Sequence, residues 1–260
     1  MSVIQAKFEE LKSKGEKALV LFVTAGDQPL SDLPKILSIL VEGGADLIEV
    51  GIPFSDPFGE GPTIQASSQR SLDNGTTPIA ILDAIAQYKS PIPIVTMGYY
   101  NTYLRGGLDE IAKRSAKAGV SGAIISDLVP DEGDEWGRVA QEAGLDTIYL
   151  VAPTSTRERI AEVCERTTGF VYAVSRTGVT GVQAEAPPEV RQLVKSVREQ
   201  TALPICVGFG ISNPDHVRTV CQVADGAVVG SYLVDLLHTE WPQGADKVLE
   251  AVRALKSATR

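Results

Sequence analysis

Eight short apolar runs, many of them rich in β-branched residues, alternate along the chain with longer segments that have helical spacing. We expect the runs to be strands, and in chain order they are Ala18–Thr24, Asp46–Val50, Ile92–Met97, Gly122–Ser126, Thr147–Val151, Gly169–Val174, Leu203–Val207 and Gly226–Val229. In the segments between them, apolar residues recur at intervals of three and four, as at Ile36, Leu37 and Leu40. Strands that alternate with helices pair in parallel, so eight such units in about 250 residues predict a (β/α)8 TIM barrel of the α/β class.

The two ends of the chain fit the same barrel. We expect an extra N-terminal helix before the first strand, and two helical segments, Ser231–Leu237 and Asp246–Lys256, follow the last one. A doubly wound sheet is the competing fold, but it needs five or six units and a nucleotide-type glycine loop, whereas the first loop here reads TAGDQP. Because no linker or low-complexity segment divides the chain, we expect residues 1–260 to form a single TIM-barrel domain.

Composition excludes several classes of protein. The net charge of −9 and the lack of clustered Lys and Arg argue against a nucleic-acid partner. No apolar run approaches the roughly 20 residues that span a bilayer, so we expect no membrane partner. Cys164, Cys206 and Cys221 have no CxxC spacing, which indicates buried or half-buried thiols in a reducing compartment. The charged N-terminus has no signal-peptide core, so we expect a cytoplasmic protein, or a stromal one if a plastid transit peptide was removed.

The stretch Leu47 to Gln65, which reads LIEVGIPFSDPFGEGPTIQ, holds two glutamates that are candidates for a site. Glu49 has apolar neighbours on both sides within a predicted strand, where desolvation disfavours its charged form. It is therefore a candidate proton-transfer group. Glu60 lies between two glycines in the next loop, where a mobile backbone can bring its carboxylate over a pocket. In the alternative interpretation, Glu49 is a surface residue of an edge strand and Glu60 is a solvated loop charge.

Three glycine-bearing loops follow the last three predicted strands. They are SRTGVTG from Ser175 to Gly181, GFGIS from Gly208 to Ser212, and GSYLV from Gly230 to Val234. The carboxyl ends of barrel strands meet on one face, so backbone N–H groups of these loops are expected around one small volume. The helix expected to start at Ser231 adds its N-terminus. The sequence therefore predicts a phosphate site that needs no strong cation.

These motifs resemble the alpha subunit family of tryptophan synthase. The resemblance rests on GIPFSDP with the following GPTIQ, LVAPTS, SRTGVTG, GFGIS and GSYLV, together with FVTAGD and MGYYN, in this order along the whole chain. It implies a barrel that cleaves indole-3-glycerol phosphate into indole and glyceraldehyde 3-phosphate. It also implies a partner, the pyridoxal-phosphate-dependent beta subunit, which receives the indole in an alpha2-beta2 heterotetramer. No cofactor is implied in this chain itself.

The resemblance also implies residue roles. Glu49 matches the catalytic glutamate, which moves a proton between the side-chain hydroxyl of the substrate and indole C3. Glu60 matches an aspartate held against the indole N–H, so GEGP stands where the family usually has ADGP or GDGP, and Phe58 replaces a smaller aliphatic residue. Thr180 matches a threonine that helps to position the acids. The implied indole slot comprises Phe22, Ile64, Tyr99, Ile124, Tyr172 and Phe209, and the implied phosphate contacts are Gly181, Phe209, Gly210, Gly230 and Ser231.

The chemistry expected of such a site agrees with these roles. Retro-aldol cleavage beside an indole ring needs C3 protonated and the adjacent hydroxyl deprotonated. Positive charge then develops at N1, where a fixed carboxylate stabilises it. Neither a metal nor a Schiff-base lysine is required, and no lysine lies in the predicted strands. His216 and His238 both fall on helix candidates, and we expect surface or helix-end positions for them.

Other functions stay open at the level of sequence. Glutamate at position 60 adds a methylene to the family's aspartate, and a misplacement of about 1 Å costs about 10²-fold in rate. One alternative is therefore that the chain is a weakly catalytic allosteric partner of a beta subunit. Another is that it is a stand-alone indole-3-glycerol phosphate lyase. A sugar-phosphate isomerase or epimerase would use the same glycine loops, but epimerases commonly need metal-binding clusters.

The loop after the fourth predicted strand has two interpretations. Asp127 aligns with a family residue that contacts the beta subunit, although the neighbouring Val129 takes the place of a usual proline. Alternatively, Asp127 is an N-terminal charge of the helix that follows, because DLVPDE carries a proline and further acids at that point.

Overall fold

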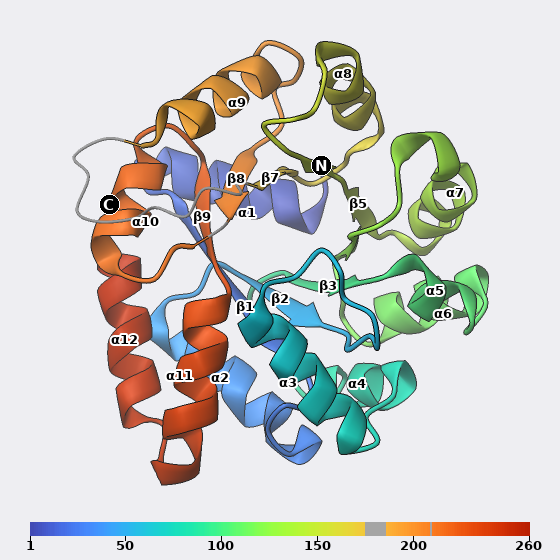
Figure 1. Cartoon of the computed structure of the whole chain (residues 1–260), viewed down its shortest axis with the longest axis vertical. Helices are drawn as coiled ribbons and strands as arrows, with labels where there is room; N and C mark the ends of the chain where they lie inside the picture. Colours follow the sequence, from blue (N-terminus) through green and yellow to red (C-terminus); the bar gives the residue numbers. More distant parts are fainter. Residues whose placement is uncertain (175–185, 209) are drawn as a thin grey trace.

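The computed structural model describes residues 1–174, 186–208 and 210–260 (Figure 1). Its strands all pair in parallel and are β1 (Ala18–Thr24), β2 (Leu47–Gly51), β3 (Ile94–Gly98), β4 (Gly122–Ile125), β5 (Asp146–Ile148), β6 (Leu150–Val151), β7 (Val171–Val174), β8 (Ile205–Gly208) and β9 (Gly226–Val229). The α-helices are α1 (Val3–Ser13), α2 (Leu33–Gly43), α3 (Pro62–Asp73), α4 (Pro78–Ile85), α5 (Tyr100–Leu104), α6 (Leu108–Lys117), α7 (Asp134–Ala143), α8 (Arg157–Arg166), α9 (Pro188–Arg198), α10 (Pro214–Cys221), α11 (Ser231–Glu240) and α12 (Asp246–Ser257). Figure 1 shows the strands at the centre with helices around them, which confirms the predicted (β/α)8 barrel.

The barrel closes through a strand that is split in two. The strands follow the order β5-β4-β3-β2-β1-β9-β8-β7-β6, so the two ends of this order are neighbours in sequence. We predicted one strand over Thr147–Val151, whereas the structure has two, because the ladder begins at Asp146 and the chain leaves it at Tyr149. The reason is that β5 pairs with β4 whereas β6 pairs with β7. The carbonyl of Tyr149 still accepts a hydrogen bond from the Tyr172 N–H at 3.2 Å, which keeps the ring continuous.

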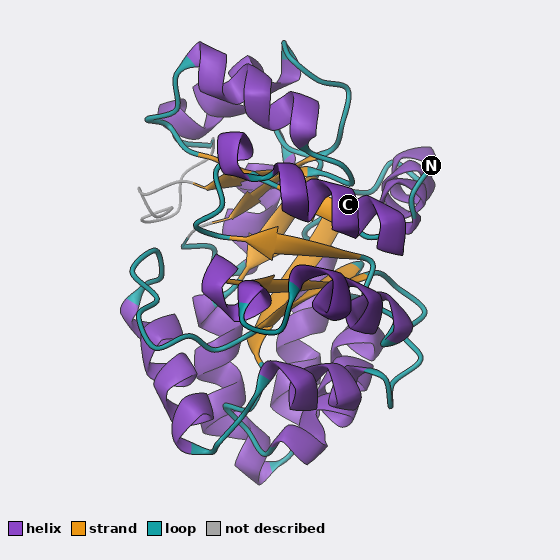
Figure 2. Ribbon diagram, turned by 90° about the vertical axis from the view of Figure 1, so that its right-hand side faces the viewer, coloured by secondary structure: helices purple, strands orange, loops and turns teal. Residues whose placement is uncertain are grey.

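The expected N-terminal helix is present as α1. Ser2 and Gln5 form a reciprocal capping box at its start, which satisfies two backbone N–H groups that would otherwise lack partners. Its apolar face carries Ile4 and Phe8, which pack into the same cluster as the residues that fill the barrel interior. Phe8 contacts Phe170 with ring centroids 6.0 Å apart. Figure 2 shows α1 at one end of the strands, so this helix closes the end of the barrel where the strands begin.

A buried carboxylate stands directly before β2. One oxygen of Asp46 accepts a hydrogen bond from the Leu19 N–H at 2.8 Å and an ion-paired hydrogen bond from Lys256 Nζ, also at 2.8 Å. Lys256 in turn pairs with Glu16 at 3.2 Å. Asp46, which precedes β2, thus contacts Leu19 of β1 and Lys256 of the C-terminal helix α12. Lys256 lies 210 residues further along the chain. Asp46 therefore serves the closure of the barrel at the start of its strands.

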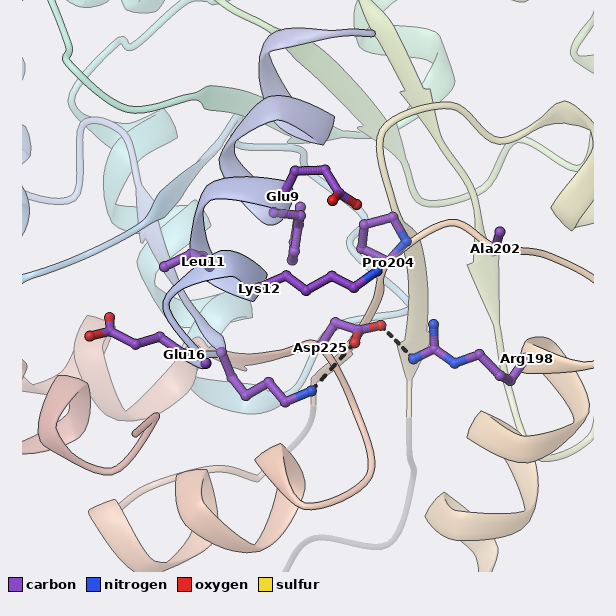
Figure 3. A pocket seen from close by; sticks show the side chains of 11 residues that line it. Glu9, Leu11, Lys12, Glu16, Arg198, Ala202, Pro204 and Asp225 are labelled. Carbon is purple, nitrogen blue, oxygen red and sulfur yellow. Dashed lines mark hydrogen bonds and ion pairs between the residues drawn. The ribbon is translucent and has the colours of Figure 1, made fainter.

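Asp225 repeats this arrangement before β9. Its carboxylate accepts the Ile205 N–H at 3.0 Å and pairs with Lys17 at 3.5 Å and with Arg198 (Figure 3). The three side chains border a cavity of about 220 Å³ between α1 and the start of β8. Figure 3 shows Lys12 extended across the same cavity from α1. The polar groups at this end of the barrel therefore hold elements together.

Other expectations concern thiols and membrane contact. The three cysteines are unpaired and buried, as predicted. In the described ranges, no helix has both the length and the apolar character needed to cross a membrane.

Candidate active site

Glu49 occupies the middle of β2 and faces the barrel interior. It stands in register with Phe22 of β1 and Val95 of β3, and its exposed fraction is 0%. Because β2 is paired on both sides, the alternative interpretation of Glu49 as an edge-strand surface residue is wrong. Neither carboxylate oxygen has a hydrogen-bond partner within residues 1–174, 186–208 and 210–260.

The environment of Glu49 favours its neutral form. Burial, reinforced by the nearby charge of Glu60, raises the pKa of Glu49 to about 8. A carboxyl group with this pKa carries its proton at neutral pH and can still release it, which suits a group that both donates and accepts a proton. The arrangement matches the predicted proton-transfer role of Glu49, although the role itself stays a prediction.

Glu60 lies in the loop between β2 and α3, two residues before that helix begins. The loop is tied locally, since the Glu60 N–H donates to the Pro57 carbonyl at 3.0 Å and Gln65 Nε2 donates to the Glu60 carbonyl at 2.8 Å. Burial raises the pKa of Glu60 above its ordinary value. Glu60 is half-buried and lines a cavity with other predicted site residues, which does not fit a fully solvated loop charge.

Four of the predicted site residues line one cavity. Glu60 lies there with Phe22, Ile64 and Tyr99, and the cavity measures about 20 Å³. This is room for about one water molecule. Ligand pockets commonly measure about 300 Å³ or more, so a bicyclic ring enters only if these side chains move apart. The structure thus brings four of the predicted site residues together around one small cavity, and their role as an indole slot stays a prediction.

Ile124 and Tyr172 lie in the cluster of side chains that fills the barrel interior. Burial, followed by the charge of Glu49, raises the pKa of Tyr172 well above its ordinary value. A Cβ atom added to Gly208 of β8 would lie 2.5 Å from the Tyr172 hydroxyl oxygen, so this hydroxyl reaches the end of β8. Both residues therefore face the interior, as the prediction requires.

The strands that precede the glycine loops end at the same level. Val174 of β7 pairs with Gly208 of β8, which pairs with Val228 of β9. Gly210 and Gly230 each follow two residues after these paired positions, so their loops start side by side. Gly210 has φ +67°, a left-handed conformation in which glycine carries no steric penalty.

The loop after β9 leads directly into a helix. Ser231 is the first residue of α11, as predicted, and it lies exposed at the helix N-terminus. A Cβ atom added to Gly230 would lie 3.8 Å from the Phe22 Cβ, so this N-terminus opens beside the apolar slot. The predicted contacts Thr180, Gly181 and Phe209 lie outside the described residues.

Tyr99 does more than line the slot. Its phenol oxygen accepts the Gly59 N–H at 3.0 Å, and its ring stacks on Phe54 and meets Phe58 edge-on. From the sequence, Tyr99 was expected only as an apolar contact, and its anchoring of the loop that carries Glu60 was not predicted. A signal was present, because the loop has two phenylalanines, one of them at a position where the family usually has an aliphatic residue.

Two further expectations need correction. His216 is at a helix end, as expected, but it is buried and not on the surface. Its backbone N–H donates to Asn213 Oδ1 at 2.9 Å, and its ring Nδ1 lies 3.4 Å from the Ser212 nitrogen. Asp127 does cap a helix, but it caps α5, since its Oδ1 accepts the Tyr100 N–H at 2.7 Å. His238 is exposed near the end of α11, as expected.

Comparisons with known proteins agree on one family. The family model described as "Tryptophan synthase alpha chain" matches residues 8–260. The tryptophan synthase alpha chain of Geobacter sulfurreducens is 47% identical over 240 residues, which cover 92% of this chain and 91% of that protein. The protein of the same name from Geobacter sp. strain M21 is 45% identical over 262 residues, covering 100% of this chain and 97% of that protein.

Solved structures give the same result. Tryptophan synthase of Mycobacterium tuberculosis contains a chain that superposes with a TM-score of 0.91 and 34% identity, covering 100% of this chain and 98% of that one. The alpha subunit of Legionella pneumophila superposes with a TM-score of 0.90 and 33% identity, again covering 100% of this chain and 98% of that one. The similarity therefore extends over the whole barrel.

Proposed function

The chain belongs to the tryptophan synthase alpha chain family, and from this membership we propose that Glu49 and Glu60 carry out the family's reaction here. The enzyme is a carbon–carbon lyase, which cleaves indole-3-glycerol phosphate to indole and glyceraldehyde 3-phosphate. The observation that carries the assignment of Glu49 is its complete burial without a hydrogen-bond partner in the described part of the chain.

Glu49 acts first as an acid. Because its pKa is raised to about 8, it holds a proton at neutral pH and donates it to indole C3. The ring then carries positive charge at N1. The Glu60 carboxylate lies against the N1–H and stabilises this charge, since a fixed anion in a buried site needs no reorganisation as the charge develops.

Glu49 then acts as a base. Its carboxylate takes the proton of the hydroxyl on the carbon attached to C3, and that carbon becomes an aldehyde as the carbon–carbon bond breaks. The electron pair of the broken bond returns to the ring, which neutralises N1 and gives indole. One carboxyl group thus gives one proton and regains one, so each turnover leaves Glu49 as it began.

The phosphate of the substrate binds at the loops after β8 and β9. The support for this part is the level register of these strand ends and the start of α11 at Ser231 beside Phe22. The N–H groups of Gly210 and Gly230 and the helix N-terminus supply positive potential there. The indole end of the substrate then reaches toward Glu60.

The beta subunit of tryptophan synthase is the partner expected for this family, and we propose an alpha2-beta2 assembly in the cytoplasm in which only the beta subunit holds pyridoxal phosphate. The docking face includes three exposed apolar side chains, Phe58 at 78%, Leu104 at 50% and Val129 at 42% exposure. They stand on the segments that follow β2, β3 and β4, at the carboxyl ends of successive strands. Exposed apolar side chains that gather in one region indicate a protein interface.

Steady-state cleavage of indole-3-glycerol phosphate tests the proposal. Purified chain should release indole and glyceraldehyde 3-phosphate in equal amounts, and an added beta subunit should raise the rate. Absence of turnover both alone and with the beta subunit would rule the activity out. If the chain then still stimulated the reaction of the beta subunit with serine and indole, it would be an allosteric partner only. Full activity that an added beta subunit leaves unchanged would indicate a stand-alone lyase.

A further inference from the structure

We propose that Tyr99 is a positioning residue for Glu60, because its phenol oxygen and its ring together fix the loop that carries the Glu60 carboxylate. This inference rests on the proposed role of Glu60. It gives Tyr99 a part in the reaction that differs from an apolar contact in the indole slot.

The hydrogen bond is placed directly beside Glu60. Tyr99 Oη accepts the N–H of Gly59 at 3.0 Å, and Gly59 precedes Glu60 in the chain. Tyr99 itself is buried, with 3% exposure, at the start of α5. A Cβ atom added to Gly59 would lie 3.2 Å from Tyr99 Oη, so the backbone approaches the phenol as closely as glycine allows. The peptide that leads into Glu60 is therefore held from a different strand–helix connection.

The ring of Tyr99 holds the rest of the loop. Phe54 stacks on it with ring centroids 4.9 Å apart and planes inclined by 17°. Phe58 meets it edge-on at 5.4 Å and 64°. Offset and edge-on aromatic pairs each contribute about 0.5–1.5 kcal/mol beyond their buried area. One side chain thus contacts the loop at its beginning, before Glu60 and at the peptide that leads into Glu60.

Among the described residues, the other hydrogen bonds of the segment 55–60 either stay within it or come from the adjoining helix α3. The side chains of Ser55 and Asp56 are exposed and bond to each other, and the Glu60 N–H bonds to Pro57 within the same loop. Gln65 reaches back to the Glu60 carbonyl from α3. These bonds shape the turn, whereas Tyr99 relates the turn to the barrel. The position of the backbone matters more for Glu60 than for an aspartate, because the same rotation of the backbone moves the carboxylate of the longer side chain further.

Tyr99→Phe is the direct test, since it removes only the phenol oxygen and keeps the ring contacts. The matched control is Tyr103→Phe, which removes a buried phenol oxygen from α5, one turn beyond Tyr99. This oxygen bonds to Thr96 Oγ1 at 3.1 Å and, among the described residues, to none in the loop. We expect kcat to fall about tenfold in Tyr99→Phe with KM changed less than threefold, because a displaced catalytic group costs rate more than binding. We expect a change of less than twofold in Tyr103→Phe. Equal losses in both variants, or a rise in KM alone, would overturn the proposal.

A double-mutant cycle separates positioning from a merely structural role. If Tyr99 acts through Glu60, adding Tyr99→Phe to Glu60→Gln should lower kcat less than twofold further. The same tenfold loss in both backgrounds would show that Tyr99 acts by another route. Failure of the wild-type chain to cleave the substrate would instead count against the proposed function.

Amide exchange of Gly59 tests the same inference without any substrate. Measured by NMR, the exchange rate of the Gly59 N–H should rise about tenfold in Tyr99→Phe, since its acceptor is lost, and should stay unchanged in Tyr103→Phe. Unchanged exchange in Tyr99→Phe would overturn the inference even in an active enzyme.

Discussion

Two buried carboxylates, one directly before β2 and one in the middle of it, have opposite environments. Asp46, directly before the strand, receives the Leu19 N–H and the Lys256 ammonium. Glu49, three residues on, receives no hydrogen bond from any described residue. Burial raises the pKa of both groups, but at Asp46 the two donors favour the charged form, whereas the charge near Glu49 is the like charge of Glu60.

The difference shows what each end of the barrel does. A buried carboxylate that is paired and hydrogen-bonded holds elements together, and removing one partner is costly. A buried carboxylate without partners lowers stability and is retained where its proton is used. Function in this fold lies at the carboxyl ends of the strands, so the contrast between Asp46 and Glu49 follows the direction of β2.

Replacement of Glu49 by Gln should give the largest effect. Removal of the general acid and base should lower kcat for cleavage of indole-3-glycerol phosphate by about 10³-fold, within the range of about 10² to 10⁴ for such groups. The fold should remain intact in circular dichroism. Cleavage at more than a tenth of the wild-type rate would break the comparison, because Glu49 would then be buried for no chemical reason.

Lys256→Met tests the opposite end. It leaves the Asp46 carboxylate with the Leu19 N–H alone, and we expect a loss of about 3 kcal/mol in the free energy of unfolding, measured by urea denaturation. The kcat of the folded protein should stay within twofold. As a control, Lys113→Met removes an exposed ion pair with Asp109, and it should change stability by no more than about 0.5 kcal/mol. Similar losses of unfolding free energy in both variants would show that the buried pair of Asp46 and Lys256 stabilises the fold no more than an exposed ion pair does.

The pH dependence of stability gives a further test of the difference between Asp46 and Glu49. The folded pKa of Glu49, about 8, lies above its ordinary value of 4.5, so the native state keeps a proton that the unfolded state releases. The resulting stabilisation is complete below about pH 4.5 and is lost as pH rises through about 8. Between pH 6 and pH 8, the free energy of unfolding of Glu49→Gln should therefore rise relative to wild type by on the order of 2 kcal/mol. A constant difference between the two proteins over that range would contradict the raised pKa.

Asp127→Ala should give the smallest effect. At the carboxyl end of β4, this exposed carboxylate caps α5 through the Tyr100 N–H, and loss of a cap costs about 1 kcal/mol. Thermal unfolding measures the loss, with Asp131→Ala as a control in the same loop. A stability equal to wild type would show that the capping bond contributes nothing to the fold.

The elements of the fold were largely predictable because they depend on local patterns. The first and last predicted strands, Ala18–Thr24 and Gly226–Val229, have the observed bounds. The apolar neighbours of Glu49 made it a candidate for burial, but the choice between a buried and an edge-strand position needed the pairing of β2 on both sides. The break at Tyr149 was not predictable, because it reflects which neighbours the two halves of a strand reach when the ring closes.

Contacts between distant parts of the chain could not be predicted from the sequence, for the same reason. The partner of Asp46 lies 210 residues away, and the partner of Tyr99 lies on a different strand–helix connection. In one of its two interpretations, Asp127 was expected at the N-terminus of the helix after it, yet its carboxylate caps α5, the helix before it. Such pairings depend on the angle between neighbouring units, which no local periodicity encodes.

The position of helix α1 limits where substrate can enter the barrel and where products can leave it. Ile4 and Phe8 pack with Phe170 in the cluster of side chains that fills the barrel interior, so α1 covers the end of the barrel where the strands begin. The proposed site lies at the opposite end, so we expect the substrate to enter and both products to leave through a doorway at the carboxyl ends of the strands. A partner protein bound over that doorway would therefore determine whether indole is released into solvent or transferred to the partner.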